Sequence, residues 1–353
     1  MLNLISKNRP LYDFSAPLVP EEAAHDDPLF TDLVATDAFQ RMKSIRFLGG
    51  IDYTLVHSPN GVESNRRFTR YQHSLGVARL ALHYCNIRDI SLTNRRLIYT
   101  AALLHDIGHA PLSHSLEPVF QEVFGISHHR ATEDIITGRV PLGKDINETL
   151  RRYGVDIERV LALIAGADLD FDGFFGGPIN FDTVDAILRS QIYARLYQNL
   201  PNPEAVIEAA IRRSNDSDRD IVDQFWSYKN FIYQHVINSR TGVMVDFACR
   251  MFMRRHLKEV KKCDYFSTEE IMFCKLPGLR QLLKSPTFES EVVRLVDGPI
   301  QYKERKFFIN SSADFFDRDD KGRYQQSKRS AVLTSKCDDS IEVMEMERDL
   351  FNE

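Results

Sequence analysis

The chain has 353 residues, of which 43% are hydrophobic and 27% charged. This composition supports a sizeable core and excludes a wholly disordered chain. The formal net charge of −5 excludes a globally basic nucleic-acid binder, although local basic clusters remain possible.

The five cysteines are odd in number, and no two of them form a C-x-x-C pair. A disulfide framework and a thiolate zinc site are therefore not expected, and a reducing compartment fits better. No apolar run approaches the roughly 20 residues that a membrane span needs, and the N-terminal residues do not resemble a signal peptide. We expect a cytoplasmic protein with no membrane partner.

Residues 1–35 are predicted to form an N-terminal arm, because four prolines punctuate residues 1 to about 30. Apolar residues at helical spacing from Thr36 predict a helix that stops at Gly49-Gly50. Residues 51–68 are predicted to be a loop or short hairpin. Helices follow from about Tyr71 to Asn86 and from an Asn94 cap to Leu104. Further helices are predicted near 113–124, 128–137, 145–152, 156–165, 181–199, 203–214, 218–238 and 242–260.

The fold class is therefore mainly α, with a helical domain over residues 36–260. Residues 261–353 are predicted to be a smaller, mixed α/β accessory region. Within it, 300–309 could be a strand, residues 317–330 are polar with a turn signal at Asp320-Lys321-Gly322, and the tail from Asp338 is acidic.

Four residues on three predicted helices offer two imidazoles and two carboxylates: His73, the pair His105-Asp106, and Asp182. A helical bundle can bring such residues together in its core. These ligand types suit Mn, Fe, Co, Ni or Zn better than Ca, and Mg less well. A divalent ion there would lower the pKa of a water molecule and polarise phosphorus, which suits hydrolysis of a phosphate ester.

The alternative is that these histidines are satisfied core residues and that the His-Asp dipeptide arises by chance. Against this, Asp106 follows an apolar run, and burying its carboxylate without a counter-ion would be costly. Gly108 permits close approach of another segment beside it.

Several segments resemble the HD-domain phosphohydrolase superfamily, and in particular its deoxynucleoside triphosphate (dNTP) triphosphohydrolase branch, which includes bacterial dGTPases and the SAM-and-HD-domain enzyme. The segments are AFQRM with the following IR and LGG (38–50), TRYQHSLGV (69–77), HDIGHAPLSH (105–114), and DTVD with Arg189. The resemblance covers roughly residues 36–250, and the ten-residue histidine segment is its most specific part.

The resemblance implies a metal site of His73, His105, Asp106 and Asp182. It also implies that His109, His114 and His128 line the phosphate site, with His129 as the alternative to its neighbour His128. His114 would be a general acid or base, and Glu117 would orient it. Arg70 would clamp a phosphate. A homo-oligomer is implied as well.

Three positions depart from the branch and bear on substrate binding together with Arg189. The branch has glutamine where this chain has Phe47, and tyrosine and aspartate where it has Ala186 and Ser190. Because the aspartate is implied to hold the sugar 3′-hydroxyl, sugar recognition must differ here. The metal chemistry is left intact.

The function predicted from the sequence is metal-dependent hydrolysis of a (deoxy)nucleoside triphosphate to nucleoside and triphosphate, with manganese among the candidate metals. One alternative is a phosphohydrolase or phosphodiesterase acting on another nucleotide or on nucleic-acid ends. The other is a nucleotide-binding sensor with little turnover.

Overall fold

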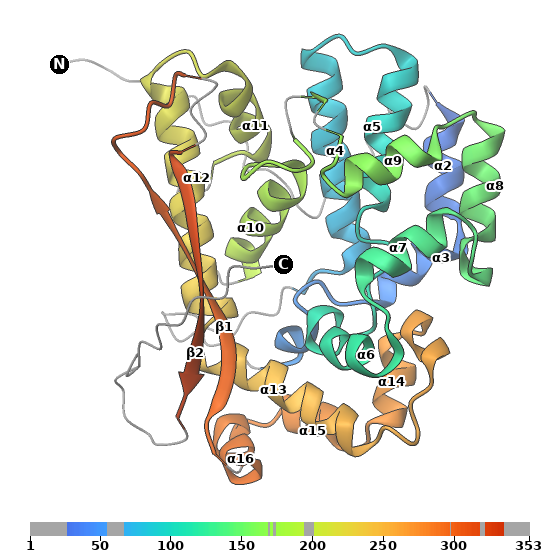
Figure 1. Ribbon diagram of the computed structural model, residues 1–353, viewed down its shortest axis with the longest axis vertical. Helices are drawn as coiled ribbons and strands as arrows, with labels where there is room; N and C mark the ends of the chain where they lie inside the picture. Colours follow the sequence, from blue (N-terminus) through green and yellow to red (C-terminus); the bar gives the residue numbers. More distant parts are fainter. Residues whose placement is uncertain are drawn as a thin grey trace, which may run out of the picture.

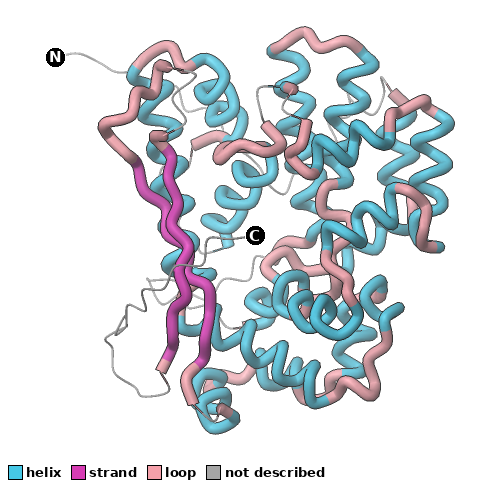
Figure 2. Tube along the Cα trace, viewed as in Figure 1, coloured by secondary structure: helices cyan, strands magenta, loops and turns pink. Residues whose placement is uncertain are grey.

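The structure is a computed structural model that describes residues 27–54, 67–168, 170–171, 174–193, 201–296, 298–317 and 322–334. Helices dominate these residues, and one antiparallel pair of strands lies at the C-terminal end (Figures 1 and 2). The predicted fold class, mainly α with a smaller mixed region, is confirmed.

The helices of the described residues are α2 (Pro28–Ala35), α3 (Asp37–Arg41), α4 (Arg70–Ile87), α5 (Leu92–Leu104), α6 (Glu117–Phe124), α7 (His128–Ile136), α8 (Lys144–Arg152), α9 (Ile157–Ile164), α10 (Phe181–Tyr193), α11 (Pro203–Arg212), α12 (Asp216–Ile232), α13 (Arg240–Arg255), α14 (Glu269–Lys275), α15 (Leu279–Leu283) and α16 (Phe288–Leu295). The strands are β1 (Ile300–Ile309) and β2 (Tyr324–Leu333). Most of the helices predicted between residues 113 and 260 occur within a few residues of their expected bounds.

Helix α4 forms the centre of the bundle and packs against α5, α10 and α11. Its start is fixed by a capping box, in which Thr69 and Gln72 each accept a hydrogen bond from the other's backbone N–H. Helix α5 runs antiparallel to it in Figure 1. It begins at Leu92 with Ser91 as N-cap, so Asn94 lies inside the helix rather than capping it.

Two glycines allow the helices around α4 and α5 to approach closely. A Cβ on Gly76 would lie 2.0 Å from Oδ1 of Asp185 on α10. A Cβ on Gly108 would lie 2.3 Å from the backbone nitrogen of Thr132 on α7. Real side chains never come so close, so both contacts need glycine, as the sequence suggested for Gly108.

The single helix predicted from Thr36 to Leu48 is wrong. Helix α3 ends at Arg41, a short 3-10 turn follows, and Ile45 is extended. Tertiary backbone pairing overrides the helical spacing, because the carbonyl of Ile45 accepts from the N–H of Arg70 at 2.9 Å and Phe47 donates to the carbonyl of Phe68 at 3.0 Å.

The end of the predicted N-terminal arm is structured. Pro28 is the first residue of α2, and Asp27 caps the helix by accepting from the N–H of Leu29. Leu29, Phe30 and Leu33 are fully or almost fully buried in the core. Residues 1–26 lie outside the described residues.

The C-terminal region combines helices α14 to α16 with a hairpin that lies along α12 (Figure 1). Strand β1 confirms the strand predicted at 300–309, and Phe307 packs on Trp226 of α12. Strand β2, which pairs with all ten residues of β1, was not predicted. Its sequence YQQSKRSAVL carries few apolar residues because most of the strand is at least partly exposed. The turn signal at 320–322 and the acidic tail from Asp338 lie wholly or mostly outside the described residues.

None of the described helices combines the length and the apolar character that crossing a bilayer requires.

Candidate metal and phosphate site

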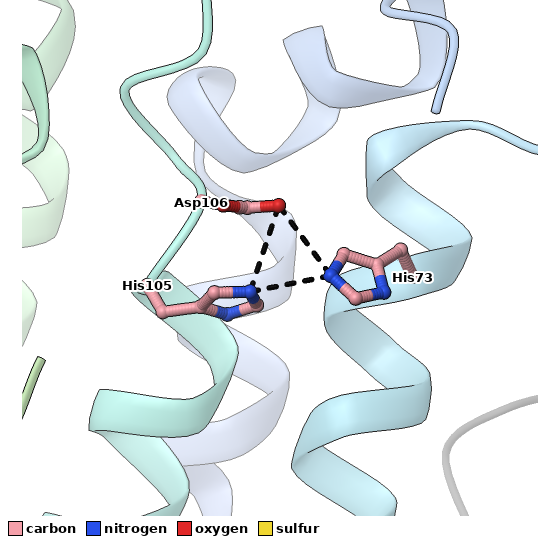
Figure 3. Close-up of side chains that lie close together, drawn as sticks. All are labelled: His73, His105 and Asp106. Atoms are coloured by element: carbon pink, nitrogen blue, oxygen red, sulfur yellow. Dashed lines mark hydrogen bonds and ion pairs between the residues drawn. The ribbon is translucent and has the colours of Figure 1, made fainter. Parts of the chain in front are cut away.

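The bundle brings the four predicted metal ligands together. His73 lies on α4, His105 and Asp106 follow the end of α5, and Asp182 lies on the first turn of α10. Nε2 of His73 is 3.3 Å from Nε2 of His105, 3.4 Å from Oδ2 of Asp106 and 3.1 Å from Oδ1 of Asp182. Figure 3 shows the first three of these residues pointing toward one another.

These spacings fit a single divalent ion. Ligands at about 2.1 Å from a metal lie about 3.0 Å apart at right angles and about 3.4 Å apart at tetrahedral angles. Nε2 of His105 completes the set, at 3.5 Å from Oδ2 of Asp106 and 3.7 Å from Oδ1 of Asp182. The distances from the two imidazoles to each other and to each carboxylate therefore suit a shared ion, and the donor types have the right chemistry.

The opposite nitrogen of each imidazole is already engaged, and this fixes the tautomer. Nδ1 of His105 donates to the carbonyl of Ala102 at 2.8 Å, one turn back on α5. Nδ1 of His73 donates to Oδ2 of Asp185 at 2.7 Å. Both Nε2 atoms therefore face the same point, where a proton or a metal ion can lie between them, and this arrangement is typical of metal-ligating histidines.

The charges around this point attract a cation. Burial would lower the pKa of His105, but Asp106 and Asp182 raise it to about 9. Burial would raise the pKa of Asp106, but His105, Arg70 and His109 hold it well below the usual value. Hydrogen bonds from His105 and His73 likewise lower the pKa of Asp182, whose carboxylate is half exposed. The site thus keeps its carboxylates ionised, and a metal ion would displace a proton from it.

Arg70 and Phe47, both predicted to bind substrate, lie beside the metal cluster. Arg70 is buried, forms an ion pair with Asp106 and donates from Nε to Oγ of Ser113 at 3.2 Å. The ring of Phe47 packs 4.7 Å from the ring of His73 and 5.1 Å from the Arg70 guanidinium. Both side chains therefore contact proposed metal ligands and help to fix their positions.

Arg189 and Ser190 do not reach the site in the way that the sequence suggested. Arg189 is fully buried and forms two 2.8 Å hydrogen bonds to the carboxylate of Asp185, which in turn orients His73. The hydroxyl of Ser190 donates to the carbonyl of Ala186 within α10 at 2.7 Å. Arg189 therefore contacts the carboxylate that orients His73, and its assignment to substrate binding stays a prediction.

A second cluster lies beside the first and contains the other predicted catalytic residues. Glu117 accepts from Nδ1 of His128 at 2.6 Å and from Nδ1 of His114 at 3.2 Å. The ring of His109 stacks on the ring of His128 at 4.7 Å, and its Nε2 donates to Oδ1 of Asp106 at 3.1 Å. Asp106 and His109 therefore join the two clusters.

The protonation of this second cluster follows from its burial and contacts. Burial and the nearby Arg70 lower the pKa of His109 well below the usual value, so this ring is neutral. Burial would raise the pKa of Glu117, but hydrogen bonds from His114 and His128 hold it low. The imidazole of His114 is 63% exposed, with Nε2 opposite the nitrogen that Glu117 binds. This is the arrangement expected of a histidine that exchanges protons with a substrate.

A cavity of about 120 Å³ opens over both clusters. His105, Asp106 and Asp182 line one side of it, and His128 and His129 line another. Phe174, Phe175 and Phe181 form its apolar wall. The cavity has room for a phosphoryl group, whereas a whole nucleotide must extend beyond it.

Asp185 and Arg41 are site residues to which sequence reasoning gave no role. The role of Asp185 could have been found from its spacing, because it lies three residues after Asp182 and four before Arg189 on one helix. No comparable spacing points to Arg41. Its buried guanidinium donates to the carbonyls of Ile107 and His109 at 3.0 and 2.8 Å, contacts that only the folded chain creates.

Comparison with known proteins agrees with this geometry. Residues 70–170 match the family model described as HD domain. This part of the chain is similar to an HD domain. The predicted resemblance to the HD-domain phosphohydrolase superfamily is thereby confirmed. So is the prediction of a divalent-metal cofactor, since HD domains are metal-dependent hydrolases and the clustered histidines and aspartate could hold such an ion.

The relatives include an uncharacterized protein of Mycoplasma pneumoniae, 23% identical over 79% of this chain and 68% of its own length. YwfO of Bacillus subtilis, also uncharacterized, is 33% identical over 38% of this chain and 30% of its own length. The deoxynucleoside triphosphate triphosphohydrolase SAMHD1 of Gallus gallus is 24% identical over 62% of this chain and 30% of its own length. The predicted resemblance to the triphosphohydrolase branch is thus confirmed. Two of these three relatives are uncharacterized. The aligned part covers less than a third of YwfO and of SAMHD1.

Proposed function

We propose that this chain hydrolyses a nucleotide phosphate ester with the help of a divalent metal ion. The observation that carries the proposal is the convergence of His73, His105, Asp106 and Asp182 at metal-ligand spacing beside a second histidine cluster. The preferred reaction is conversion of a (deoxy)nucleoside triphosphate to nucleoside and triphosphate, because one relative, SAMHD1, is a deoxynucleoside triphosphate triphosphohydrolase.

In this proposal, His73, His105, Asp106 and Asp182 hold the ion. When bound there, the ion would supply Lewis acidity toward a phosphate oxygen and make a nearby water more acidic. Because His105, Asp106 and Asp182 line the 120 Å³ cavity together with His128, the proposal has the phosphoryl group bind between the two clusters.

His114 manages protons in the same proposal. Ionised Glu117 accepts the Nδ1–H of His114, so Nε2 keeps the lone pair and can take or return a proton at the exposed side of the ring. His109 stays neutral beside it, and His128 shares Glu117 and stacks on His109. The positive charge of Arg70, one ion pair away from the ligand shell, stabilises negative charge on the phosphate.

A second candidate substrate is a longer nucleotide or a nucleic-acid end. A cavity of about 960 Å³ between α7, α8 and α9 shares His129 and Ile164 with the cavity over the metal cluster. Arg130, Arg139 and Arg151 line this larger cavity. It also supports this candidate that Ser190 is engaged within its own helix and that Phe47 carries no hydrogen-bonding group.

A product assay separates the candidates. The purified chain, loaded with Mn²⁺, is incubated with dNTPs, NTPs, nucleoside monophosphates and single-stranded DNA, and the products are resolved by ion-exchange chromatography. Release of nucleoside and triphosphate supports the preferred reaction, whereas pyrophosphate, phosphate or mononucleotide indicates another phosphohydrolase. Tight nucleotide binding without turnover under any metal would instead indicate a sensor.

A further inference from the structure

The loop between the two clusters has an unusual backbone. It runs from Ile107 to Ser113 and links the metal-binding pair His105-Asp106 to His114. Leu112 and Ser113 both have positive φ, at 57° and 45°, although neither is glycine. This conformation is unfavourable for residues other than glycine, so neighbouring groups must hold the loop in this shape.

Glu269, the first residue of α14, is one of those groups. Its carboxylate is 2% exposed and accepts from the backbone N–H of Leu112 at 3.1 Å and of Arg46 at 2.8 Å, both through Oε1. The phenol of Tyr53 donates to Oε2. No lysine or arginine forms an ion pair with Glu269 within the described residues, so its contacts here are hydrogen bonds from these three donors.

Arg41 holds the other end of the same loop. It donates to the carbonyls of Ile107 and His109, and its second amino group donates to the carbonyl of Ser267 at 3.2 Å. Ser267 and Glu269 therefore hold both ends of the loop, although both belong to the region that the sequence suggested was accessory.

The loop is also connected to the metal cluster by hydrogen bonds of Ser113. The hydroxyl of Ser113 donates to the carbonyl of Arg46 at 3.0 Å and accepts from Nε of Arg70, whose guanidinium is paired with Asp106. The next residue in the chain is His114. A displacement of Leu112 would thus move Arg70 and His114 together.

We propose that Glu269 is a positioning residue for the hydrolytic site, and that residues 267–269 with Arg41 form a brace that sets the loop from Ile107 to Ser113. This inference rests on the proposed function, because the brace is proposed to support hydrolysis at that site. It also predicts that removing the C-terminal region removes activity even though all four proposed metal ligands remain.

The length of the Glu269 side chain, rather than its charge, carries this role. Glutamine at this position keeps an oxygen for the two backbone N–H groups and offers an amide N–H to Tyr53. Aspartate keeps the charge but withdraws the oxygens by about 1.5 Å, one carbon–carbon bond. The Gln and Asp variants therefore separate geometry from charge.

The kinetic test measures kcat, KM and bound metal on the full chain with the substrate found in the product assay. Glu269→Asp and Glu269→Ala should lower kcat by at least 10-fold with little change in KM or metal content. Glu269→Gln should keep kcat within about 3-fold of the natural protein. The control is Asp264→Ala, which removes another buried carboxylate of the same segment that accepts from the N–H of Lys261 and from Lys275 but does not touch the loop.

A second readout does not depend on turnover. Hydrogen exchange of the amides in residues 107–115 should speed up at least 10-fold in Glu269→Asp relative to Glu269→Gln, while exchange in α8 stays the same. Equal exchange in the two variants, or unchanged kcat in Glu269→Ala, would overturn the brace. If the natural protein turns over no substrate, the proposed function fails, and the exchange comparison still decides whether the brace exists.

Discussion

The two histidine clusters of this chain touch through Asp106 and His109, and Nδ1 donates to an acceptor in both of them, yet the clusters differ in how far their imidazoles are exposed. In the metal cluster, His73 and His105 are buried or nearly so, and both Nε2 atoms point inward to one spot. In the cluster around Glu117, His114 presents its ring to solvent. In the proposed function, the same residue type thus binds a cation in one cluster and exchanges protons in the neighbouring one.

The strongest test of this contrast removes a metal ligand. His105→Ala should abolish metal binding and lower activity by at least about a thousand-fold, because it deletes one of the converging nitrogens. Metal content is measured by mass spectrometry beside the kinetic assay. His256→Ala is the matched control, since His256 also ends a helix and hydrogen-bonds through Nδ1 to a carbonyl on its own helix. Retained activity in His105→Ala would break the assignment.

The second cluster should behave differently. His114→Gln should leave metal content unchanged and lower kcat by about 10²–10⁴-fold, as expected for the loss of a proton-transfer group. His83→Gln serves as control, because His83 forms a comparable 3.1 Å contact with Glu208 away from the site. If His114→Gln lost the metal, the distinction between the clusters would disappear.

A smaller effect is expected from the residue that orients His73. Asp185→Asn should weaken metal binding about 10–100-fold, because an amide holds the His73 tautomer less firmly and leaves Arg189 without its carboxylate. Titration calorimetry with Mn²⁺ measures this. The control Asp223→Asn breaks the ion pair with Arg323 near the hairpin and should not change metal affinity.

The smallest effect concerns stability and has opposite signs for two buried glutamates. Burial raises the pKa of Glu269 to about 7, above an ordinary value of 4.5. The folded state therefore holds the proton more tightly, and this contribution to stability is full below about pH 4.5 and lost as the pH rises through 7. For Glu117, whose pKa is held low, the contribution is lost as the pH falls instead.

Urea unfolding of the natural protein and Glu269→Gln at pH 5, 6, 7 and 8 measures this linkage. The difference between their free energies of unfolding should move by up to about 3 kcal/mol in favour of the variant as the pH rises. Asp52, whose pKa is raised to about 6 by burial, titrates in both proteins, and its charge contributes to the raised pKa of Glu269 in the natural protein. If the free energies of unfolding of the two proteins changed in parallel with pH, the raised pKa of Glu269 would be contradicted.

Most helices of the bundle and the proposed metal site could be predicted from the sequence, because short stretches of the chain indicate them. The spacing of apolar residues gave the helices of the bundle, and the ten-residue segment from His105 pointed to the metal site. The backbone from Met42 to Phe47 could not be predicted, since its shape depends on pairing with residues 68–70. Neither could Arg41 or Glu269, whose partners are backbone groups about 65 to 225 positions away.

Gly76 sets a limit on what this architecture tolerates. It is the point where α4 and α10 touch, and a methyl group there would overlap the carboxylate that orients His73. Alanine, the mildest replacement and the better helix former, would push the two helices apart and carry Asp182 away with α10. Alanine would therefore stabilise the helix, whereas glycine keeps α4 and α10 close enough for the proposed metal ligands to meet.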